Sequence, residues 1–322
     1  MAQRSIPVTI LTGYLGAGKT TLLNYLLTQD HGKKIAVIVN EFGQVGIDNQ
    51  LVAQADEEII AMNNGSICCT VRKDLIRIIQ ELLHHPHQIE HILIETTGLA
   101  DPAPVVQTFF VEDGVKTNTH LEAVVTVIDA KHIQAHWDAK EVQEQVLFAN
   151  VILLNKTDLV TSDQLDPLES KLRSMNPLAK LYRTQHSQIG VEAVLGLNAF
   201  DVDHALAIDE NFLSKHVHEH DKSVSSVSLT ESGTIDLEAL TSWLHQRLNH
   251  HAADTFRVKG IFNVADQKQR YVMQGVHSLV SGHYDRDWQP QESHLNELVF
   301  IGRNLEAEQL REEFQACFVE IQ

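Results

Sequence analysis

The chain is poor in cysteine and in positive charge, and it has no long apolar run. Only three of its 322 residues are cysteines, and two of them are adjacent, which argues against a disulfide framework. Its 25 lysines and arginines are outnumbered by 43 acidic residues, and the net charge of −18 argues against nucleic acid or an anionic membrane as a partner. No apolar stretch reaches transmembrane length, and the N-terminus lacks the apolar core of a signal peptide. We therefore expect a cytoplasmic protein.

The remaining composition is that of a folded protein with a surplus of histidine. Hydrophobic residues make up 43% of the chain and charged residues 21%, as in soluble globular proteins. The length is enough for one large domain or two ordinary ones. Nineteen histidines are many for such a chain, and an excess of histidine in an acidic protein is a compositional hint of metal handling.

A phosphate-binding loop occupies residues 13–20, which read Gly-Tyr-Leu-Gly-Ala-Gly-Lys-Thr. It lies between an apolar strand pattern at residues 8–12 and a helix pattern at residues 20–28, as the G-x-x-x-x-G-K-[ST] motif requires. Its glycines allow backbone N–H groups to point at a triphosphate, while Lys19 is expected to reach the outer phosphates and Thr20 to ligate Mg²⁺. The residues predicted to contact the nucleotide here are Gly13, Gly16, Ala17, Gly18, Lys19, Thr20 and Thr21.

A second motif predicts the base of the nucleotide. An apolar strand pattern at residues 151–154 is followed by Asn155-Lys156-Thr157-Asp158. In P-loop GTPases this N-K-x-D tetrad reads guanine, because the Asp carboxylate accepts two hydrogen bonds from an edge that adenine lacks. The stem of Lys156 is expected to pack over the purine face, and Asn155 to tie the tetrad to the phosphate loop. Taken alone the tetrad is also compatible with a helix cap, but its place downstream of a P-loop favours GTP.

A third apolar run carries an acid at its end. Residues 91–98 read His-Ile-Leu-Ile-Glu-Thr-Thr-Gly, which predicts a central parallel strand whose acidic end lies beside the phosphates. Glu95 is expected to hold Mg²⁺ or its water, and Gly98 to give a backbone N–H to the γ-phosphate and to act as a hinge. The predicted catalytic residues are Lys19, Thr20, Glu95 and Gly98. The alternative for Glu95 is an acid that merely ends a strand.

The order of the patterns predicts the fold class. Strand and helix patterns alternate through the first part of the chain, which indicates an α/β P-loop NTPase fold with a mostly parallel sheet and helices on both faces. The expected strands are residues 8–12, 35–40, 58–62, 91–95, 123–129, 151–155 and 181–184. The expected helices are residues 20–28, 71–84, 105–110, 140–149 and 162–175.

A second, smaller α+β domain follows. After residue 197 the pattern fades into an acidic, histidine-bearing stretch, and it then resumes as strand, helix, three strands and helix. The expected elements are strands at 223–230, 256–264, 271–280 and 297–301 and helices at 236–248 and 306–317, the first capped near Thr234 or Asp236 and the last carrying Cys317 into a core. We expect a GTPase domain at residues 1–197, a linker at 198–222 and a C-terminal domain at 223–322.

Together these motifs resemble the CobW-like GTPases, a family of proposed metal-insertion chaperones related to UreG and HypB. The resemblance covers most of the chain, including the C-terminal domain. It rests on residues 11–21, 40–43, 64–69, 95–98, 127–130, 155–158, 257–260 and 298–302. It implies GTP hydrolysis with Mg²⁺ and the delivery of a transition metal, with Zn²⁺ as the expected ion, to a metalloprotein client.

The resemblance also implies a metal site, which this chain has altered. The family's C-x-C-C hallmark falls at residues 66–69, which read Ser-Ile-Cys-Cys, so a serine replaces the first thiolate. A neutral hydroxyl is a weak zinc ligand, and the candidates for the missing donor are Glu41, a histidine, water or an atom of a client. Gln44 stands where relatives often carry an acid. The alternative is that Cys68 and Cys69 are only small buried apolar residues.

Three alternating histidines form a second candidate for metal binding. His216, His218 and His220 lie in the expected linker, and in an extended segment they would point to one side. The alternative is a solvated polar linker.

The sequence therefore predicts a GTPase that binds a transition metal near Cys68 and Cys69 and hands it to a client as the nucleotide is hydrolysed. A rival prediction is a GTP-gated docking module or metal buffer with little catalytic role. A P-loop kinase is a third, but the guanine tetrad argues against it. A second copy of the chain is a further candidate partner, because the small C-terminal domain is suited to recognition.

Overall fold

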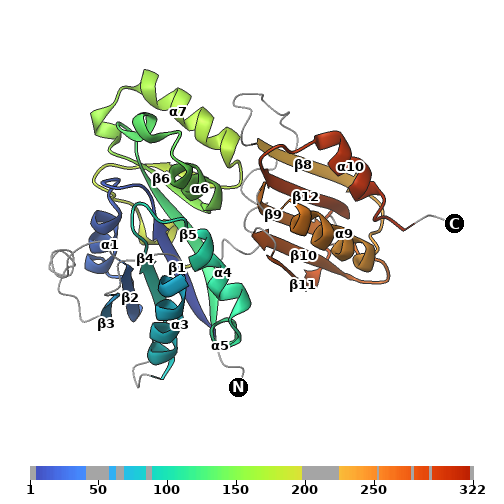
Figure 1. The fold of residues 1–322 in the computed structure, drawn as a ribbon, viewed down its shortest axis with the longest axis horizontal. Helices are drawn as coiled ribbons and strands as arrows, with labels where there is room; N and C mark the ends of the chain where they lie inside the picture. Colours follow the sequence, from blue (N-terminus) through green and yellow to red (C-terminus); the bar gives the residue numbers. More distant parts are fainter. Residues whose placement is uncertain are drawn as a thin grey trace. The chain divides into compact units, whose positions relative to one another are not determined.

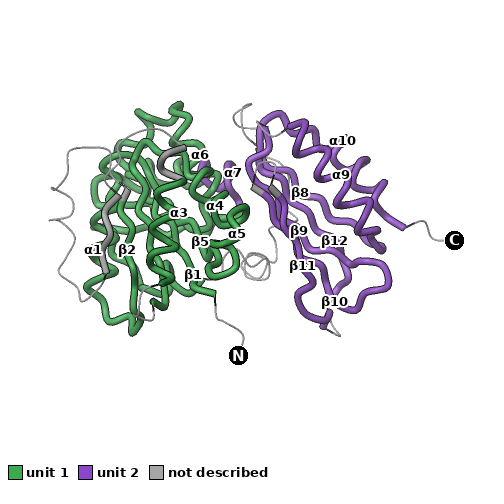
Figure 2. Tube along the Cα trace, turned by 60° about the horizontal axis from the view of Figure 1, so that its bottom comes forward, with its two compact units in different colours: residues 1–170, 178–200 green, residues 171–177, 201–322 purple. Residues whose placement is uncertain are grey.

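The computed structural model describes residues 5–40, 58–62, 69–84, 89–197, 225–251, 254–276, 279–289 and 292–319. The chain forms two compact units, one of residues 1–170 and 178–200 and the other of residues 171–177 and 201–322 (Figure 2). Each unit has its own sheet and its own hydrophobic core. None of the helices in the described ranges is both long and apolar enough to cross a membrane.

The first unit is built on a sheet of seven parallel strands (Figure 1). In spatial order they are β3 (Glu58–Met62), β2 (Ile35–Asn40), β4 (His91–Glu95), β1 (Ile6–Thr12), β5 (Thr119–Asp129), β6 (Val151–Asn155) and β7 (Lys180–Arg183). All residues of β4 and β6 are buried, as expected for central parallel strands with both faces covered.

Helices cover the two faces of this sheet. They are α1 (Lys19–Thr28), α3 (Cys69–Leu83), α4 (Ala103–Val111), the short α5 (Asp113–Lys116), α6 (Lys140–Phe148) and α7 (Ser162–Met175). Helix α1 connects β1 to β2, towards the β3 edge of the sheet, whereas α3, α4 and α6 each lead to a strand nearer the β7 edge. Because such crossovers are right-handed, α1 lies on one face of the sheet and α3, α4 and α6 lie on the other. Leu22, Leu23 and Leu26 of α1 share a core with side chains of β2, β4, β5 and β6. The predicted α/β P-loop fold is confirmed.

The topology brings four strand ends to one place. Strands β4, β1, β5 and β6 are neighbours, and because they are parallel their carboxyl ends lie at the same edge of the sheet. Those ends are Glu95, Thr12, Asp129 and Asn155. Residues far apart in the sequence therefore meet where the loop after β1 turns into α1.

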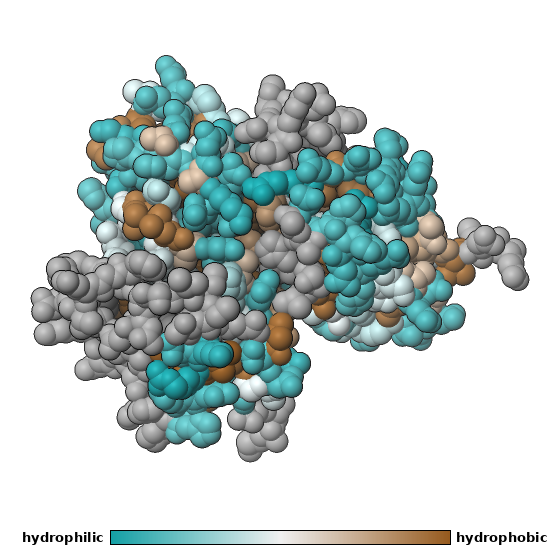
Figure 3. Space-filling view, in the orientation of Figure 1, coloured by the Kyte–Doolittle hydropathy of each residue, from teal (hydrophilic) through white to brown (hydrophobic). Residues whose placement is uncertain are grey.

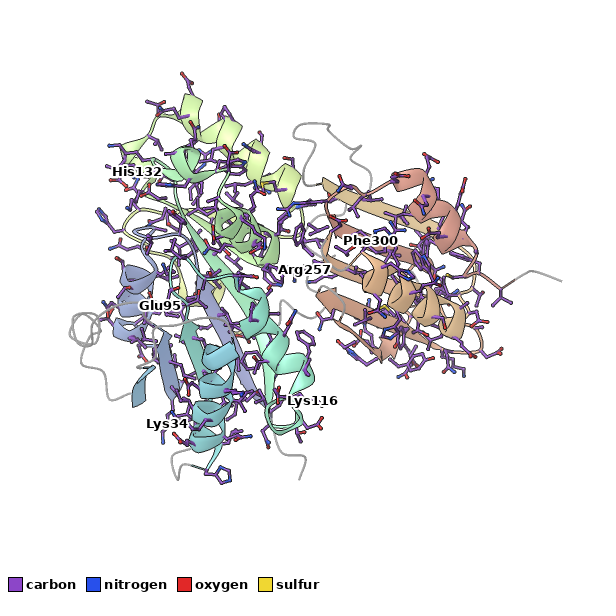
Figure 4. The ribbon with its side chains drawn as sticks, viewed as in Figure 1. Lys34, Glu95, Lys116, His132, Arg257 and Phe300 are labelled. Atoms are coloured by element: carbon purple, nitrogen blue, oxygen red, sulfur yellow. The ribbon has the colours of Figure 1, made fainter. Side chains whose placement is uncertain are left out.

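The second unit is an antiparallel sheet with two helices. Its strands, in spatial order, are β11 (Leu279–Asp287), β10 (Gln269–Val276), β9 (Thr255–Phe262), β12 (Leu295–Gly302) and β8 (Ser225–Ser232). Helices α9 (Leu237–His250) and α10 (Ala307–Gln315) pack on one face of it around Phe300, which is labelled in Figure 4. The rings of Phe300 and Trp243 meet edge to face. Asp236 caps α9, since its Oδ1 accepts hydrogen bonds from the backbone of Glu238 and Ala239, which confirms one of the two predicted caps.

Cys317 is buried in this second core, as predicted, but the prediction of one strand at residues 271–280 is wrong. Strands β10 and β11 form an antiparallel hairpin there, with Val276 paired to Leu279. The two residues between them, His-Ser, include none of the glycine, asparagine or aspartate that usually mark a two-residue hairpin turn, so the strand pattern runs on without a visible break. The sheet consequently has one strand more than the sequence predicts.

Buried His91 predicts an acid-sensitive first unit. Its side chain is fully buried, its Nε2 lies 3.0 Å from Thr9 Oγ1, and burial lowers its pKa from 6.5 to about 3. The folded state thus keeps His91 neutral, and its contribution to stability is complete above pH 6.5 and is lost as the pH falls towards 3. We expect the free energy of unfolding to drop by up to about 5 kcal/mol over this range.

Urea unfolding of the wild type and of His91→Gln between pH 7 and pH 4 measures this effect. Glutamine keeps a hydrogen-bonding side chain but does not titrate, so the variant should lose less stability on acidification. Equal losses in both proteins would assign the acid sensitivity to other groups.

Candidate nucleotide-binding site

The loop after β1 holds its lysine inward. Gly18 precedes α1 in a left-handed conformation (φ 113°), and α1 begins at Lys19. The Lys19 side chain is buried, and its Nζ donates hydrogen bonds to the carbonyls of Gly13 at 2.9 Å and Tyr14 at 3.4 Å. The ammonium is therefore inside the ring of loop carbonyls, within reach of a phosphate that approaches the helix N-terminus.

The two predicted magnesium ligands touch each other. Thr20 Oγ1 donates a hydrogen bond of 2.8 Å to Glu95 Oε1, and Glu95 is buried at the carboxyl end of β4 (Figure 4). A hydroxyl and a carboxylate at this spacing supply the hard oxygen donors that Mg²⁺ prefers, so the residues present fit that ion. The structure brings Thr20 and Glu95 together although 74 residues separate them in the sequence.

The segment after Glu95 packs against the phosphate loop and is hydrogen-bonded to α6. A Cβ at Gly98 would lie 2.6 Å from the backbone nitrogen of Leu15, so only glycine allows this approach. Gln145 of α6, which is buried, donates hydrogen bonds to the carbonyls of Gly98 at 3.2 Å and Ala100 at 3.1 Å. Gly98 thus lies against the phosphate loop, as its predicted contact with a γ-phosphate requires.

Asn155 joins the base-reading tetrad to the phosphate loop. Its Nδ2 donates hydrogen bonds to Ala17 O at 3.0 Å and to Ser187 Oγ at 2.9 Å, and its Oδ1 accepts from the backbone N–H of Ser187 at 2.9 Å. Ser187 Oγ in turn donates to Gly18 O at 3.0 Å. The predicted tie between Asn155 and the phosphate loop is confirmed, and Ser187 forms a second tie that the sequence does not predict.

The conformation of Lys156 turns its side chain towards the phosphate loop. This residue has a left-handed backbone (φ 60°, ψ 34°), and its Nζ donates to Gly16 O and to Asp129 Oδ2, each at 2.7 Å. Asp158, the predicted reader of the guanine edge, lies two residues on and is exposed. Within the tetrad the Lys156 side chain is thus bonded to the phosphate loop, whereas the Asp158 side chain is exposed.

Asp129 is a site residue that sequence reasoning did not assign. Burial alone would raise the pKa of Asp129, but hydrogen bonds from Lys156 and His132 outweigh it and lower the pKa below its usual value. Its signal in the sequence is the same as that of Glu95, an acid at the end of an apolar strand run. Ser187 left no such signal, because the segment after β7 contains no motif and its two left-handed residues, His186 and Ser187, are not glycines.

A cavity borders this part of the site. Its volume is about 280 Å³, and it lies between the phosphate loop, the end of β5, the 3₁₀ turn η1 (Ile133–His136) and α6. The lining residues are Tyr14, Leu15, Gly16, Thr126, Val127, Ile128, Asp129, His132, Ile133, Ala135, His136, Val142, Gln145, Val146 and Lys156. In its wall the ring centroids of Tyr14 and His136 lie 4.7 Å apart.

Apolar side chains are exposed beside the phosphate loop. Leu15 is 58% exposed and Leu99 is 51% exposed, whereas the described surface in Figure 3 is mostly hydrophilic with small separate apolar patches. Two further short 3₁₀ turns are η2 (Thr157–Leu159), which contains Asp158, and η3 (Val191–Ala193).

The predicted transition-metal ligands fall almost entirely outside the described residues. These are Glu41, Cys68, His216, His218 and His220, and the replaced position Ser66 lies there too. Cys69 is the first residue of α3, but its side chain is not described. In the part of the chain that the structure describes, no group of three or more His, Cys, Asp or Glu side chains is arranged to hold a metal ion.

Two family models match the chain. Residues 7–183 match the CobW/HypB/UreG nucleotide-binding domain, and residues 224–318 match the C-terminal domain of the cobalamin synthesis protein cobW. The two matches together span both compact units.

Full-length relatives and a solved structure are also similar. The zinc chaperone YjiA of Escherichia coli is 34% identical over 96% of this chain and 98% of its own length. The zinc chaperone CobW of Pseudomonas aeruginosa is 32% identical over 95% of this chain and 91% of its length. The zinc-regulated GTPase metalloprotein activator 1 of Schizosaccharomyces pombe is 31% identical over 93% and 83%. The crystal structure of Zn(II)-bound YjiA GTPase matches with a TM-score of 0.75 at 30% identity, covering 98% of this chain and 100% of that one.

Proposed function

This chain belongs to the CobW/HypB/UreG family of nucleotide-binding proteins, and we propose that it is a GTP-hydrolysing zinc chaperone that passes its metal to a client protein. The family resemblance predicted from the motifs is confirmed by both family models. The chain is a GTPase that works with GTP, Mg²⁺ and Zn²⁺, in keeping with relatives named zinc chaperone and zinc-regulated GTPase.

The single observation that carries the nucleotide part is the hydrogen bond from Asn155 Nδ2 to Ala17 O. It fastens the tetrad that reads guanine to the loop that wraps the phosphates, so one ligand must satisfy both. In the proposed reaction a water attacks the γ-phosphate. Lys19 and Mg²⁺ on Thr20 and Glu95 neutralise the charge that develops, and the Gly98 N–H contacts the γ-phosphate.

The remaining nucleotide contacts follow the sequence predictions. Backbone N–H groups of the phosphate loop wrap the phosphates, and the side chains of Lys156 and Asp158 face the base. The proposed contact residues are Gly13, Gly16, Ala17, Gly18, Lys19, Thr20, Thr21, Asn155, Lys156 and Asp158.

Zinc is proposed to bind near Cys68 and Cys69, next to the start of α3. The missing third thiolate makes this a weaker and more exchangeable site than C-x-C-C provides, with Glu41 or the histidines of residues 216–220 as additional donors. Binding of GTP would order the loops around residues 40–43, and hydrolysis would release them together with the metal. The C-terminal domain, residues 223–322, would then recognise the client or a second copy of the chain, in the cytoplasm.

A GTP-gated docking module or metal buffer is the second candidate. It shares the nucleotide site but needs no turnover. Slow hydrolysis combined with tight binding of zinc through residues 216–220 would favour it over a chaperone.

Zinc affinity with and without nucleotide tests the proposal. We expect Cys68→Ala/Cys69→Ala to bind Zn²⁺ at least about tenfold more weakly than the wild type, because two thiolate ligands are lost. A non-hydrolysable GTP analogue should change the wild-type zinc affinity by about fivefold or more, and zinc should change the affinity for the analogue by the same factor. Competition with a chromophoric chelator measures the first quantity and calorimetry the second.

Cys317→Ala is the matched control. This thiol is buried in the second core, and burial raises its pKa to about 11, so it stays protonated and should contribute nothing to zinc binding. If all three proteins bind zinc equally, the site is not at Cys68 and Cys69. If the analogue leaves wild-type zinc affinity unchanged, the chain is a GTPase whose metal site is not coupled to its nucleotide.

A further inference from the structure

We propose that Asp129 is a positioning residue for base recognition, which holds the ammonium of Lys156 so that the stem of Lys156 lies against the purine ring of GTP. The inference rests on the proposed use of GTP. It adds to the base-reading tetrad a residue that lies on a different strand and has a different place in the sequence.

The sheet places the two residues side by side. Asp129 at the end of β5 is paired in register with Asn155 at the end of β6, and Ala130 donates a backbone hydrogen bond of 2.9 Å to Asn155 O. Lys156 therefore leaves the sheet directly beside Asp129. Because this pairing is part of the parallel ladder, the distance between the two residues is fixed by the core and not by the ligand.

The contacts of Lys156 define a fixed direction for a side chain that is otherwise free to rotate. Its ammonium donates to one neutral acceptor, Gly16 O, and one carboxylate, Asp129 Oδ2, both at 2.7 Å. The charge-assisted bond is the stronger of the two. The Lys156 side chain is still 31% exposed, so water can reach its ammonium. Without the carboxylate, hydration would stabilise the ammonium more than a single hydrogen bond to Gly16 O does.

The two carboxylate oxygens of Asp129 accept hydrogen bonds from different groups. Oδ1 accepts hydrogen bonds from the backbone N–H groups of Lys131 at 2.9 Å and His132 at 3.1 Å, which stabilises the turn into η1. Oδ2 accepts from Lys156 Nζ at 2.7 Å and from His132 Nδ1 at 2.9 Å (His132 is labelled in Figure 4). One oxygen thus shapes the backbone, and the other holds the base-reading lysine.

This division allows a variant that removes only the second task. In Asp129→Asn the amide oxygen can still accept from the two backbone N–H groups, which leaves the amide NH₂ facing the Lys156 ammonium. Two donors then oppose each other and the lysine is released. We expect the Kd for GDP and for a GTP analogue to rise about tenfold, by the same factor, because the base is common to both. The value of kcat at saturating GTP should stay within about twofold, because the side chains proposed to act on the transferred phosphoryl group, Lys19, Thr20 and Glu95, are unchanged.

A double-mutant cycle shows whether the effect passes through Lys156. Lys156→Met keeps an apolar stem but has no ammonium, and it should weaken GDP binding by a similar factor. Combined with it, Asp129→Asn should cause no further loss. Purely structural damage by Asp129→Asn would instead add to the effect of Lys156→Met, and that result would overturn the inference.

Two further variants separate this role from its neighbours. His132→Ala removes the other side-chain donor to Oδ2 and should change the Kd for GDP by less than about twofold. A tenfold loss here would assign the effect to the contact between Asp129 and His132 and would overturn the inference. Asp158→Asn should shift the preference from guanosine towards xanthosine triphosphate, whereas Asp129→Asn should leave that preference unchanged, since Lys156 contacts the face of the ring and not its edge.

The outcomes for the wild type and for Asp129→Asn separate this inference from the proposed function. If the wild type fails to bind GDP, the proposed function fails. If the wild type binds GDP and Asp129→Asn binds it equally well, only this inference fails.

Discussion

Replacing Lys19 with alanine should reduce kcat/KM for GTP by at least two orders of magnitude. Its ammonium is buried in the phosphate loop, 2.9 Å from Gly13 O and 3.4 Å from Tyr14 O, where we expect the outer phosphates to bind. A positive charge in such a site lowers the free energy of a transition state that carries negative charge on three equatorial oxygens by several kcal/mol. A loss of about 3 kcal/mol corresponds to a factor of about 100 in rate.

Phosphate release at saturating and at limiting GTP measures this prediction. Both kcat and kcat/KM should fall, because the lysine acts on the transferred phosphoryl group as well as on binding. Lys73→Ala, on an exposed position of α3, removes the same charge outside the site and should leave both values within about twofold. Unchanged turnover in Lys19→Ala would contradict the assignment of the phosphate loop and with it the proposed function.

The parts of the site that the sequence predicts are those encoded by neighbouring residues. The phosphate loop and the N-K-x-D tetrad are contiguous, and each follows an apolar strand pattern, so both their chemistry and their edge of the sheet can be read directly. The contact between Thr20 and Glu95 follows from the same rule, since parallel strands deliver their carboxyl ends to one edge.

The parts that escape prediction depend on which strands become neighbours. Asp129 reaches Lys156 only because β5 lies beside β6, and Ser187 reaches Gly18 only because β7 ends next to them. Strand order is a property of the whole sheet and has no local signature. The separation of β10 from β11 was not predicted for a related reason. The two residues between them in the sequence, His-Ser, include no glycine or asparagine, and the two strands are stabilised by pairing with each other.

Gly13→Ala should strongly destabilise the first unit. Gly13 has φ of +136°, which L residues rarely adopt, and a Cβ there would lie 2.1 Å from Val127 O in the backbone of the central strand β5. Neither partner can move, because Val127 is fully buried in the parallel ladder and Gly13 O accepts the bond from Lys19. Overlap with backbone at this distance, added to the strain in φ, is expected to cost at least about 3 kcal/mol.

Thermal unfolding followed by circular dichroism compares this variant with Gly32→Ala. Gly32 also has a positive φ, +61°, but a Cβ there would meet nothing within 4 Å, so Gly32→Ala carries the backbone strain without the overlap. That control should lose only about 1 kcal/mol, whereas Gly13→Ala should unfold well below it and fail to bind GDP. The difference between the two variants isolates the close approach of the phosphate loop to β5. If both variants unfold at the same temperature, the loop does not need this approach, and the rigid placement of Gly13 O under the Lys19 ammonium would have to come from elsewhere in the loop.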